Sequence, residues 1–289
     1  MRAWDNPQDR RPGVEGSLSY VLGSDADERQ RLELQHQLWQ PQAWAGWRRA
    51  GLEPGMAVLD LGSGPGWAAR ELAEMVGPGG RVLGLERDRT YLAAAEALYG
   101  DNQLPQLSFQ QHDLSHPPLA LPQTFDLSWC RWVAMFLGDL NPLISQLELA
   151  LRPGGAALFH EYIHWSSFGL YPHGAALKRF AAAVLNSFEA SGGDANVGRR
   201  LPSLLAARGF LIEEVRPLAS AGGPGSWVAQ WLEPFVHVYG RRLQELGLWS
   251  ATDAREAEAA MADARRDPGS LWVGPTVLEL VARRPGTPT

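Results

Sequence analysis

Short apolar runs alternate with longer amphipathic segments along most of this chain. Runs bounded by glycine, proline or polar residues have the length of buried strands, and we expect strands at 58–61, 81–85, 107–111, 125–130, 156–159, 211–218 and 278–281. Between them, apolar residues spaced three and four apart predict helices at 24–40, 42–50, 68–75, 90–99, 133–151, 174–190, 199–208, 227–246 and 252–266, with Pro41 separating the first two. This alternation predicts an α/β fold with a mostly parallel sheet.

The turn after the first strand is the richest in glycine. Gly62, Gly64 and Gly66 leave no Cβ in the path of a ligand, and the following helix points its free N–H groups at the turn. A strand, a glycine turn and a helix N-terminus are typical of a nucleotide-cofactor site, although they also occur in a plain tight connection. Trp67 stands where a dinucleotide fingerprint needs its third glycine, and Lys178, the only lysine, is far from the turn, which excludes a phosphate-binding loop.

Composition narrows the class of protein. A chain of 289 residues, 45% hydrophobic and 20% charged, suffices for one large α/β domain. The net charge of −6 argues against nucleic acid or an anionic membrane as the main partner. Cys130 is the only cysteine, so no internal disulfide forms, and the N-terminus lacks the apolar run of a secretory signal. We therefore expect a cytoplasmic protein, and the preference for arginine over lysine suggests a bacterium with a GC-rich genome.

Two motifs resemble those of a known family. The run DLGSGPG at 60–66 closely resembles motif I of the class I S-adenosylmethionine (SAM)-dependent methyltransferases, and LRPGG at 151–155 resembles the segment before their fifth strand. The resemblance is good over roughly 50–165 and looser over 197–284, and the UbiE-like, or type 11, group of small-molecule methyltransferases is the most similar. It implies a Rossmann-like seven-stranded sheet, SAM as cofactor and S-adenosylhomocysteine (SAH) as product.

Several strand ends are candidate cofactor contacts. Glu86 ends the second strand, where an acid accepts hydrogen bonds from ribose hydroxyls in doubly wound sheets. By the resemblance, Asp113 meets the adenine amino group and Leu114 meets the ring. The end of the fourth strand should contact the methionine part of the cofactor. The remaining candidate cofactor residues are Tyr20, Asp60, Gly62, Gly64, Gly66, Cys130 and Arg131.

The domain organisation predicted from the sequence is simple. We expect a loose arm at 1–16, one methyltransferase domain over 17–284 and a tail at 285–289. In the family, N-terminal helices and insertions cover the acceptor site, so segments 17–50, 165–195 and 226–268 are expected to form a helical cap. Cap helices of one subunit can pack against those of another, so a homo-oligomer is an alternative to a monomer.

Methyl transfer from a sulfonium is an in-line displacement, so the protein must align the reactants, exclude water and remove a proton where the acceptor carries one. Histidine suits that last task near neutral pH. His160 and His164 are the first candidate bases, followed by Glu161 and Tyr20, although a structural role is an open alternative for each histidine. Tyr162, Trp165 and Trp231 are candidates to line an aromatic acceptor pocket, with core packing as the alternative.

Residues 160–164 also spell HExxH, the signature of zinc proteases. The zinc interpretation requires a helix, because only helical spacing brings both histidines onto one face. Here the motif follows LRPGG and an apolar run at the place of the fifth strand, so we expect a strand and no zinc. No acid ends the fourth strand, so the divalent metal of catechol-type methyltransferases is not expected either.

Three functions compete at this point. The leading hypothesis is a metal-independent SAM-dependent methyltransferase that methylates O, N or C of a small, aromatic or polyketide-like metabolite of the kind found in bacterial secondary metabolism. The second is a non-methylating SAM-binding enzyme or cofactor-binding protein on the same scaffold. The third is an NAD-dependent oxidoreductase, which Trp67 disfavours.

Overall fold

The computed structural model describes residues 26–100, 104–121 and 123–286. The predicted arm at 1–16, the candidate Tyr20 and the expected helix start at Ser24 lie outside these ranges, as do residues 287–289 of the predicted tail.

Seven strands form one sheet in the order β3-β2-β1-β4-β5-β10-β7. Neighbours from β3 to β5 pair in parallel, whereas β10 runs antiparallel to both β5 and β7. The predicted seven-stranded, mostly parallel α/β sheet is therefore confirmed. The strands are β1 (Ala57–Leu61), β2 (Arg81–Glu86), β3 (Leu107–Gln111), β4 (Phe125–Arg131), β5 (Leu151–His164), β7 (Leu211–Leu218) and β10 (Thr276–Arg283).

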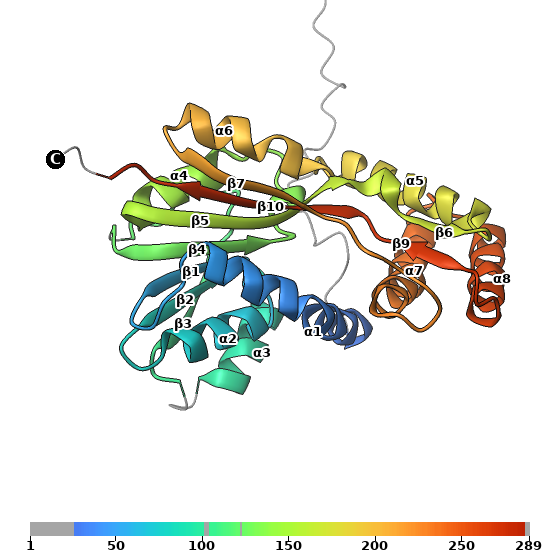
Figure 1. Ribbon diagram of the computed structural model, residues 1–289, viewed down its shortest axis with the longest axis horizontal. Coiled ribbons are helices and arrows are strands. Elements are labelled where there is room, and N and C mark those ends of the chain that lie inside the picture. The colour runs from blue at the N-terminus through green and yellow to red at the C-terminus, as the bar shows by residue number, and fades with distance from the viewer. Residues whose placement is uncertain (1–25, 101–103, 122, 287–289) are drawn as a thin grey trace, which may run out of the picture.

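Helices cover both faces of this sheet, which explains why β1 is buried along its whole length (Figure 1). On one side lie α1 (Ala26–Arg49), α2 (Trp67–Val76) and α3 (Arg89–Tyr99), where Trp47 and Leu72 pack on Val58. On the other side lie α4 (Asn141–Ala150), beside β5, and α6 (Leu201–Ala207), beside β7 and β10, and their buried leucines belong to one core cluster with Leu59 and Leu61 of β1.

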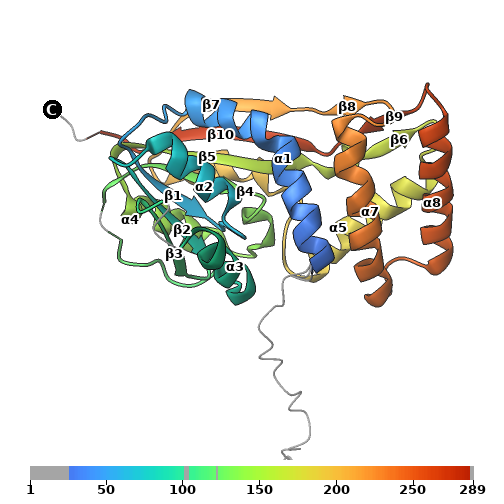
Figure 2. The same ribbon diagram turned by 90° about the horizontal axis from the view of Figure 1, so that it is seen from below.

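A helical cap lies beyond one end of the sheet (Figure 2). It contains α5 (Ala175–Ala190), α7 (Trp227–Glu245) and α8 (Ala251–Arg266), and α1 packs against α7. A three-stranded antiparallel sheet of β6 (Gly169–Tyr171), β9 (Leu271–Val273) and β8 (Ala221–Gly222) completes the cap. The sequence predicted the helices but not this small sheet, because strands of two or three residues carry no readable periodicity.

The prediction of two N-terminal helices was wrong, because α1 continues through Pro41 as one helix. A proline inside a helix lacks the N–H that would bond to the preceding turn, and this costs stability. Trp39 and Ala43 on either side of Pro41 are buried, so packing holds the helix together across the defect.

The predicted helix from Val133 to Leu151 was also wrong in its extent. A single 3-10 turn, η1 (Ala134–Phe136), follows β4, and α4 begins only at Asn141 with Pro142 in its first turn. The LRPGG segment belongs to β5 instead of closing a helix. Leu151 already pairs with Phe125, and the register then shifts so that Ala156 pairs with Leu127.

The segment predicted as a helix at 199–208 is likewise divided, into a 3-10 turn η3 (Val197–Arg199) and the short α6.

None of the helices in the described ranges combines the length and apolarity needed to span a lipid bilayer.

Candidate functional site

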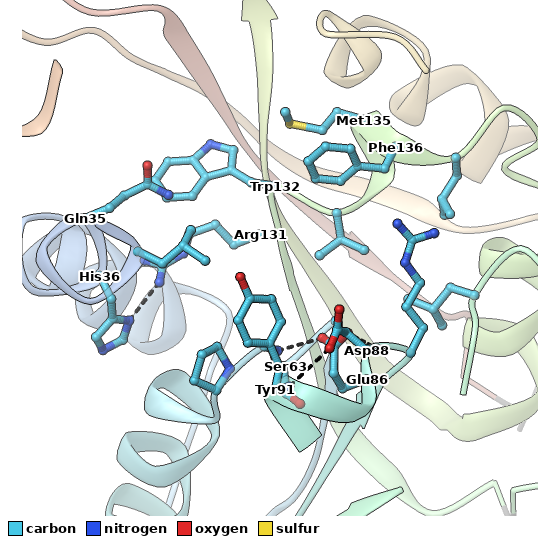
Figure 3. A pocket seen from close by; sticks show the side chains of 18 of the residues that line it. Gln35, His36, Ser63, Glu86, Asp88, Tyr91, Arg131, Trp132, Met135 and Phe136 are labelled. Atoms are coloured by element: carbon cyan, nitrogen blue, oxygen red, sulfur yellow. Dashed lines mark hydrogen bonds between the residues drawn. The ribbon is translucent and has the colours of Figure 1, made fainter. Parts of the chain in front are cut away.

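The main pocket lies at the carboxyl ends of β1, β2 and β4 and under α1 (Figure 3). Ligands bind at this edge of open α/β sheets because the loops that leave the strands diverge there. Ser63, Glu86 and Asp88 lie on one side of the pocket, and Met135 and Phe136 lie on the other. One face of α1 covers it through Arg31 and His36.

The three glycines of the first turn have positive φ angles but different neighbours. A Cβ on Gly62 would lie 2.4 Å from Cγ2 of Val133, so this glycine lets the segment after β4 approach the turn. A Cβ on Gly66 would lie 2.8 Å from the Phe109 ring. Gly64 borders the pocket and has no described atom within 4 Å of such a Cβ. Gly62 and Gly64 thus line the pocket, whereas Gly66 serves packing at the start of α2.

Glu86 both fixes the glycine turn and faces the pocket. Its Oε2 accepts a hydrogen bond from the Gly64 N–H at 2.8 Å, and its Oε1 accepts one from the Asp88 N–H at 2.7 Å. Burial raises the pKa of Glu86, although these N–H donors oppose the shift. A carboxylate has about four acceptor positions, so acceptor capacity remains for a ribose hydroxyl.

The expected adenine contacts lie in the same pocket. Asp113 and Leu114 both line it. Oδ1 of Asp113 accepts hydrogen bonds from the Ser115 N–H and hydroxyl, and Oδ2 lies 4.0 Å from a guanidinium nitrogen of Arg87. Burial alone would raise the pKa of Asp113, but the bonds from Ser115 and the charge of Arg87 lower it, so the carboxylate is ionised at neutral pH.

A small polar pocket adjoins the glycine turn between Asp60 and Arg131. Oδ2 of Asp60, Oγ of Ser63 and Nη1 of Arg131 are buried and have no hydrogen-bond partner within the described chain. Burial raises the pKa of Asp60 to about 7 and lowers the pKa of Arg131 to about 10. Buried polar atoms are nearly always paired, so these three leave hydrogen-bonding capacity for a polar ligand.

Arg131 is held in place by α1 and α2. Its Nη2 donates to Nδ1 of His36 at 2.8 Å, as the dashed line in Figure 3 shows. Nε2 of His36 therefore carries the proton and donates to Oε1 of Glu71 at 3.0 Å. Burial lowers the pKa of His36, which agrees with a neutral ring. Glu71 also accepts from Gln40 and Trp44, so three side chains of α1 converge on one carboxylate of α2.

The remainder of the main pocket is mostly aromatic. Trp132, with a positive φ of 55°, stacks on Tyr162 with 5.7 Å between ring centroids. Arg31 is the cation at this end, and its guanidinium bonds to both carboxylate oxygens of Glu28 at 2.7 Å. The apolar lining includes Trp132, Met135, Phe136, Leu137, Tyr162, Trp165, Phe188 and Phe235.

The other predicted residues divide between the pocket and its surroundings. Tyr162 and Trp165 line the pocket, whereas Trp231 lies behind it, donates from Nε1 to Oε1 of Gln35 and stacks on Trp132. Cys130 is buried beside Glu161 and does not line the pocket.

The three candidate bases on β5 lie away from the pocket lining. The HExxH run is extended, so it lacks the helical spacing that a zinc protease needs. His160 is fully buried against Trp129 and bonds to Oε2 of Glu279 at 3.0 Å, and His164 is exposed at the strand end. Glu161 is buried beneath the segment after β4. Within the described residues no cluster of three potential metal ligands occurs.

Sequence reasoning missed several pocket residues on the covering helices. His36, Gln35 and Arg31 lie on one face of α1, and Tyr91 belongs to α3. Their polar and aromatic side chains at helical spacing do not differ from those of a solvated or packed helix face. Among these missed residues, only Trp132 had a signal in the sequence, because it is the second residue after the predicted strand end at Cys130.

Comparisons with known proteins agree with this geometry. Residues 58–155 match the family described as "Methyltransferase domain". A 2-phytyl-1,4-naphtoquinone methyltransferase of Thermosynechococcus vestitus is 31% identical over 50% of this chain and 59% of its own length. A demethylmenaquinone methyltransferase of Lactococcus lactis is 29% identical over 45% of this chain and 50% of its own length. Most of the curated relatives are thus matched over about half their length.

Solved structures share the fold over most of the chain. A phosphoethanolamine N-methyltransferase 2 of Haemonchus contortus, solved with SAH, has a TM-score of 0.59 at 16% identity and covers 94% of this chain and 61% of its own. The [4+2]-cyclase SpnF has a TM-score of 0.53 at 17% identity and covers 86% and 82%. At such identities the likeness shows the fold alone.

The strand order and the glycine turn define a Rossmann-like α/β fold with a pocket at the strand ends. More particularly, residues 58–155 are similar to the methyltransferase domain family, and relatives named as methyltransferases match about half of the chain.

Proposed function

We propose that this protein binds SAM in the main pocket and transfers its methyl group to a neutral small molecule held at the aromatic end. The observation that carries the proposal is the polar pocket beside the glycine turn, where Asp60 and Arg131 have unpaired buried atoms. The methionine part of SAM has an ammonium for Asp60 and a carboxylate for Arg131. NAD has no amino-acid group that would pair with both.

The chain's own residues perform three tasks in this proposal. Glu86 accepts from the ribose hydroxyls, and Asp113 accepts from the adenine amino group, which together fix the nucleoside half. Asp60 and Arg131 fix the other end. When bound, SAM supplies a methyl group already activated by its cationic sulfur. The aromatic residues exclude water and hold the acceptor in line with that methyl group.

The acceptor is expected to be neutral and aromatic or polyketide-like. Trp165, Phe188 and Phe235 offer flat apolar surfaces that suit a ring system. Glu28 already balances the charge of Arg31, so this end of the pocket is not set up for a phosphate or carboxylate. Two relatives are named for a menaquinone and a naphthoquinone, which supports an acceptor of this class.

Calorimetric titration with SAM, SAH and NAD tests the cofactor assignment. We expect SAM and SAH to bind and NAD not to bind, and Asp60→Asn to weaken SAH binding about tenfold because the ammonium loses its ionic partner. Glu74→Gln on the exposed face of α2 is the matched control. A well-folded wild type that binds neither SAM nor SAH would refute the proposal.

One observation favours a second function, SAM binding without methyl transfer. His160 and His164, the candidate bases, do not line the pocket. An enzyme that uses bound SAM for another reaction needs no base beside the methyl group. Incubation of the SAM complex with a panel of neutral phenols, amines and carbon acids separates the two, because only methyl transfer produces SAH.

A further inference from the structure

We propose that Glu161 is a positioning residue, whose buried carboxyl group holds the segment after β4 against the glycine turn and thereby shapes the cofactor site. The proposal builds on the proposed function, because SAH serves as one of its probes. It gives Glu161 a task different from that of a base, since Glu161 does not line either pocket.

The contacts of Glu161 are directed at backbone N–H groups. Its Oε1 accepts hydrogen bonds from the N–H of Val133 and the N–H of Ala134, both at 2.8 Å. The side chain is fully buried, and the Cys130 thiol lies 3.8 Å from the same oxygen. β5 and β4 are parallel neighbours in which His160 pairs with Arg131, so Glu161 reaches across from the adjacent strand.

The segment that Glu161 holds is part of the pocket lining. Arg131, Trp132, Val133 and Met135 all line the main pocket. The methyl groups of Val133 occupy the space that a Cβ on Gly62 would need, so the segment rests directly on the glycine turn. A displacement of Val133 would therefore separate the segment after β4 from the glycine turn, and both of these line the cofactor site.

Trp132 needs such support because its backbone is strained. Its φ of 55° is a conformation that residues other than glycine rarely adopt, and it persists only where the surroundings impose it. The Trp132 N–H donates to the carbonyl of His160 at 3.0 Å, and the next two N–H groups donate to Glu161. β5 thus fixes three consecutive N–H groups, and with them the Trp132 ring that stacks on Tyr162.

A carboxyl group suits this position because one of its oxygens can accept from two N–H groups. Burial raises the pKa of Glu161 to about 8, while the bonds from Val133 and Ala134 oppose that shift. A glutamine has the same shape, and its amide oxygen accepts the same two bonds. An alanine leaves both N–H groups without a partner in a buried place.

The test compares three variants by calorimetry with SAH, thermal unfolding and hydrogen exchange of the ligand-free protein. We expect Glu161→Ala to weaken SAH binding about tenfold or more, because a small misplacement of site residues has a large effect. Exchange should speed up in residues 131–137 of this variant. Glu161→Gln should bind SAH within about threefold of wild type, since it keeps the acceptor.

Glu279→Gln is the matched control, because Glu279 is an equally buried carboxylate on the adjacent strand that does not line either pocket. It bonds to Arg49 and His160, so its loss should lower the melting temperature while leaving SAH affinity and exchange of 131–137 unchanged. A role of Glu161 in overall stability alone would make Glu161→Ala behave like this control, and that result would overturn the proposal.

Two further outcomes are distinguishable. If wild type binds no SAH, the proposed function fails, while exchange of residues 131–137 in Glu161→Ala still decides whether Glu161 holds the segment. If Glu161→Ala does not fold, Glu161→Asp takes its place, because its shorter side chain withdraws the oxygen from Val133 and Ala134. Wild-type exchange and SAH affinity in that variant would contradict the positioning role.

Discussion

Burial at the end of β1 makes Asp60 an unusually weak acid. A carboxyl whose ordinary pKa is 3.8 titrates at about 7 here, because desolvation penalises its charged form more than Arg131 favours it. Ionisation of Asp60 therefore costs the ligand-free protein stability as the pH rises through 7. A cationic group placed beside it would reverse the balance.

This gives a prediction for the pH dependence of cofactor binding. The ammonium of SAH favours the ionised carboxylate, so binding should release a proton and tighten between about pH 6 and about pH 8, by up to about tenfold per pH unit below the pKa. Calorimetry in buffers of different ionisation enthalpy measures the released proton. Asp60→Asn should bind more weakly and lose this pH dependence. A wild-type affinity that is flat over that range would contradict the pairing.

At the scale of elements, the sequence predicted the features that depend on residues close together in the chain. The order of β1, the glycine turn and α2 follows from apolar runs and from glycines at positive φ, and Glu86 follows from its place at a strand end. Other features depend on tertiary contacts. From the sequence alone, Pro41 predicts a helix break. The helix continues because Trp39 and Ala43, on either side of Pro41, are buried.

The residues of the candidate site fall into the same two groups, those that local sequence predicts and those that depend on tertiary contacts. Strand-end residues such as Asp113 and Arg131 could be placed from sequence because parallel strands end at one edge. His160 could not, because its environment is set by Glu279, 119 positions away in the chain. Which face of α1 covers the pocket is likewise decided by Glu71 on α2, a contact that no periodicity reveals.

Glu71 provides a prediction for the element α1. Because His36, Gln40 and Trp44 all donate to it, Glu71→Gln should loosen α1 over the pocket. Disturbing a buried acceptor of this kind costs about 1–3 kcal/mol of unfolding free energy, and SAH affinity should fall with it. Urea unfolding and calorimetry measure both.

Glu74→Gln on the same helix is the control for Glu71→Gln. Glu74 forms an exposed ion pair with Arg70, and such pairs contribute little to stability. Equal effects of the two substitutions would show that α1 is not held through Glu71.

At the scale of the whole molecule, the sheet and the cap contribute different halves of one pocket. The glycine turn, Glu86 and Asp113 come from the sheet side, whereas Phe188 comes from α5 and Phe235 from α7. Trp39 joins the two parts, because its ring packs edge-on against Trp132 after β4 and against Trp231 on α7. Cofactor and acceptor binding should therefore respond to different substitutions.

Phe235→Leu tests this division because it removes the ring at the aromatic end and keeps a large apolar side chain. We expect the KM for the best acceptor of the phenol, amine and carbon-acid panel to rise about tenfold, since the ring loses its stacking surface, while SAH affinity stays unchanged. Glu86→Ala should do the reverse, weakening SAH binding while leaving the acceptor KM at saturating SAM unaltered. If Phe235→Leu weakened SAH as much as it weakened the acceptor, the cap would belong to the cofactor site as well, and the separation of the two halves would be wrong.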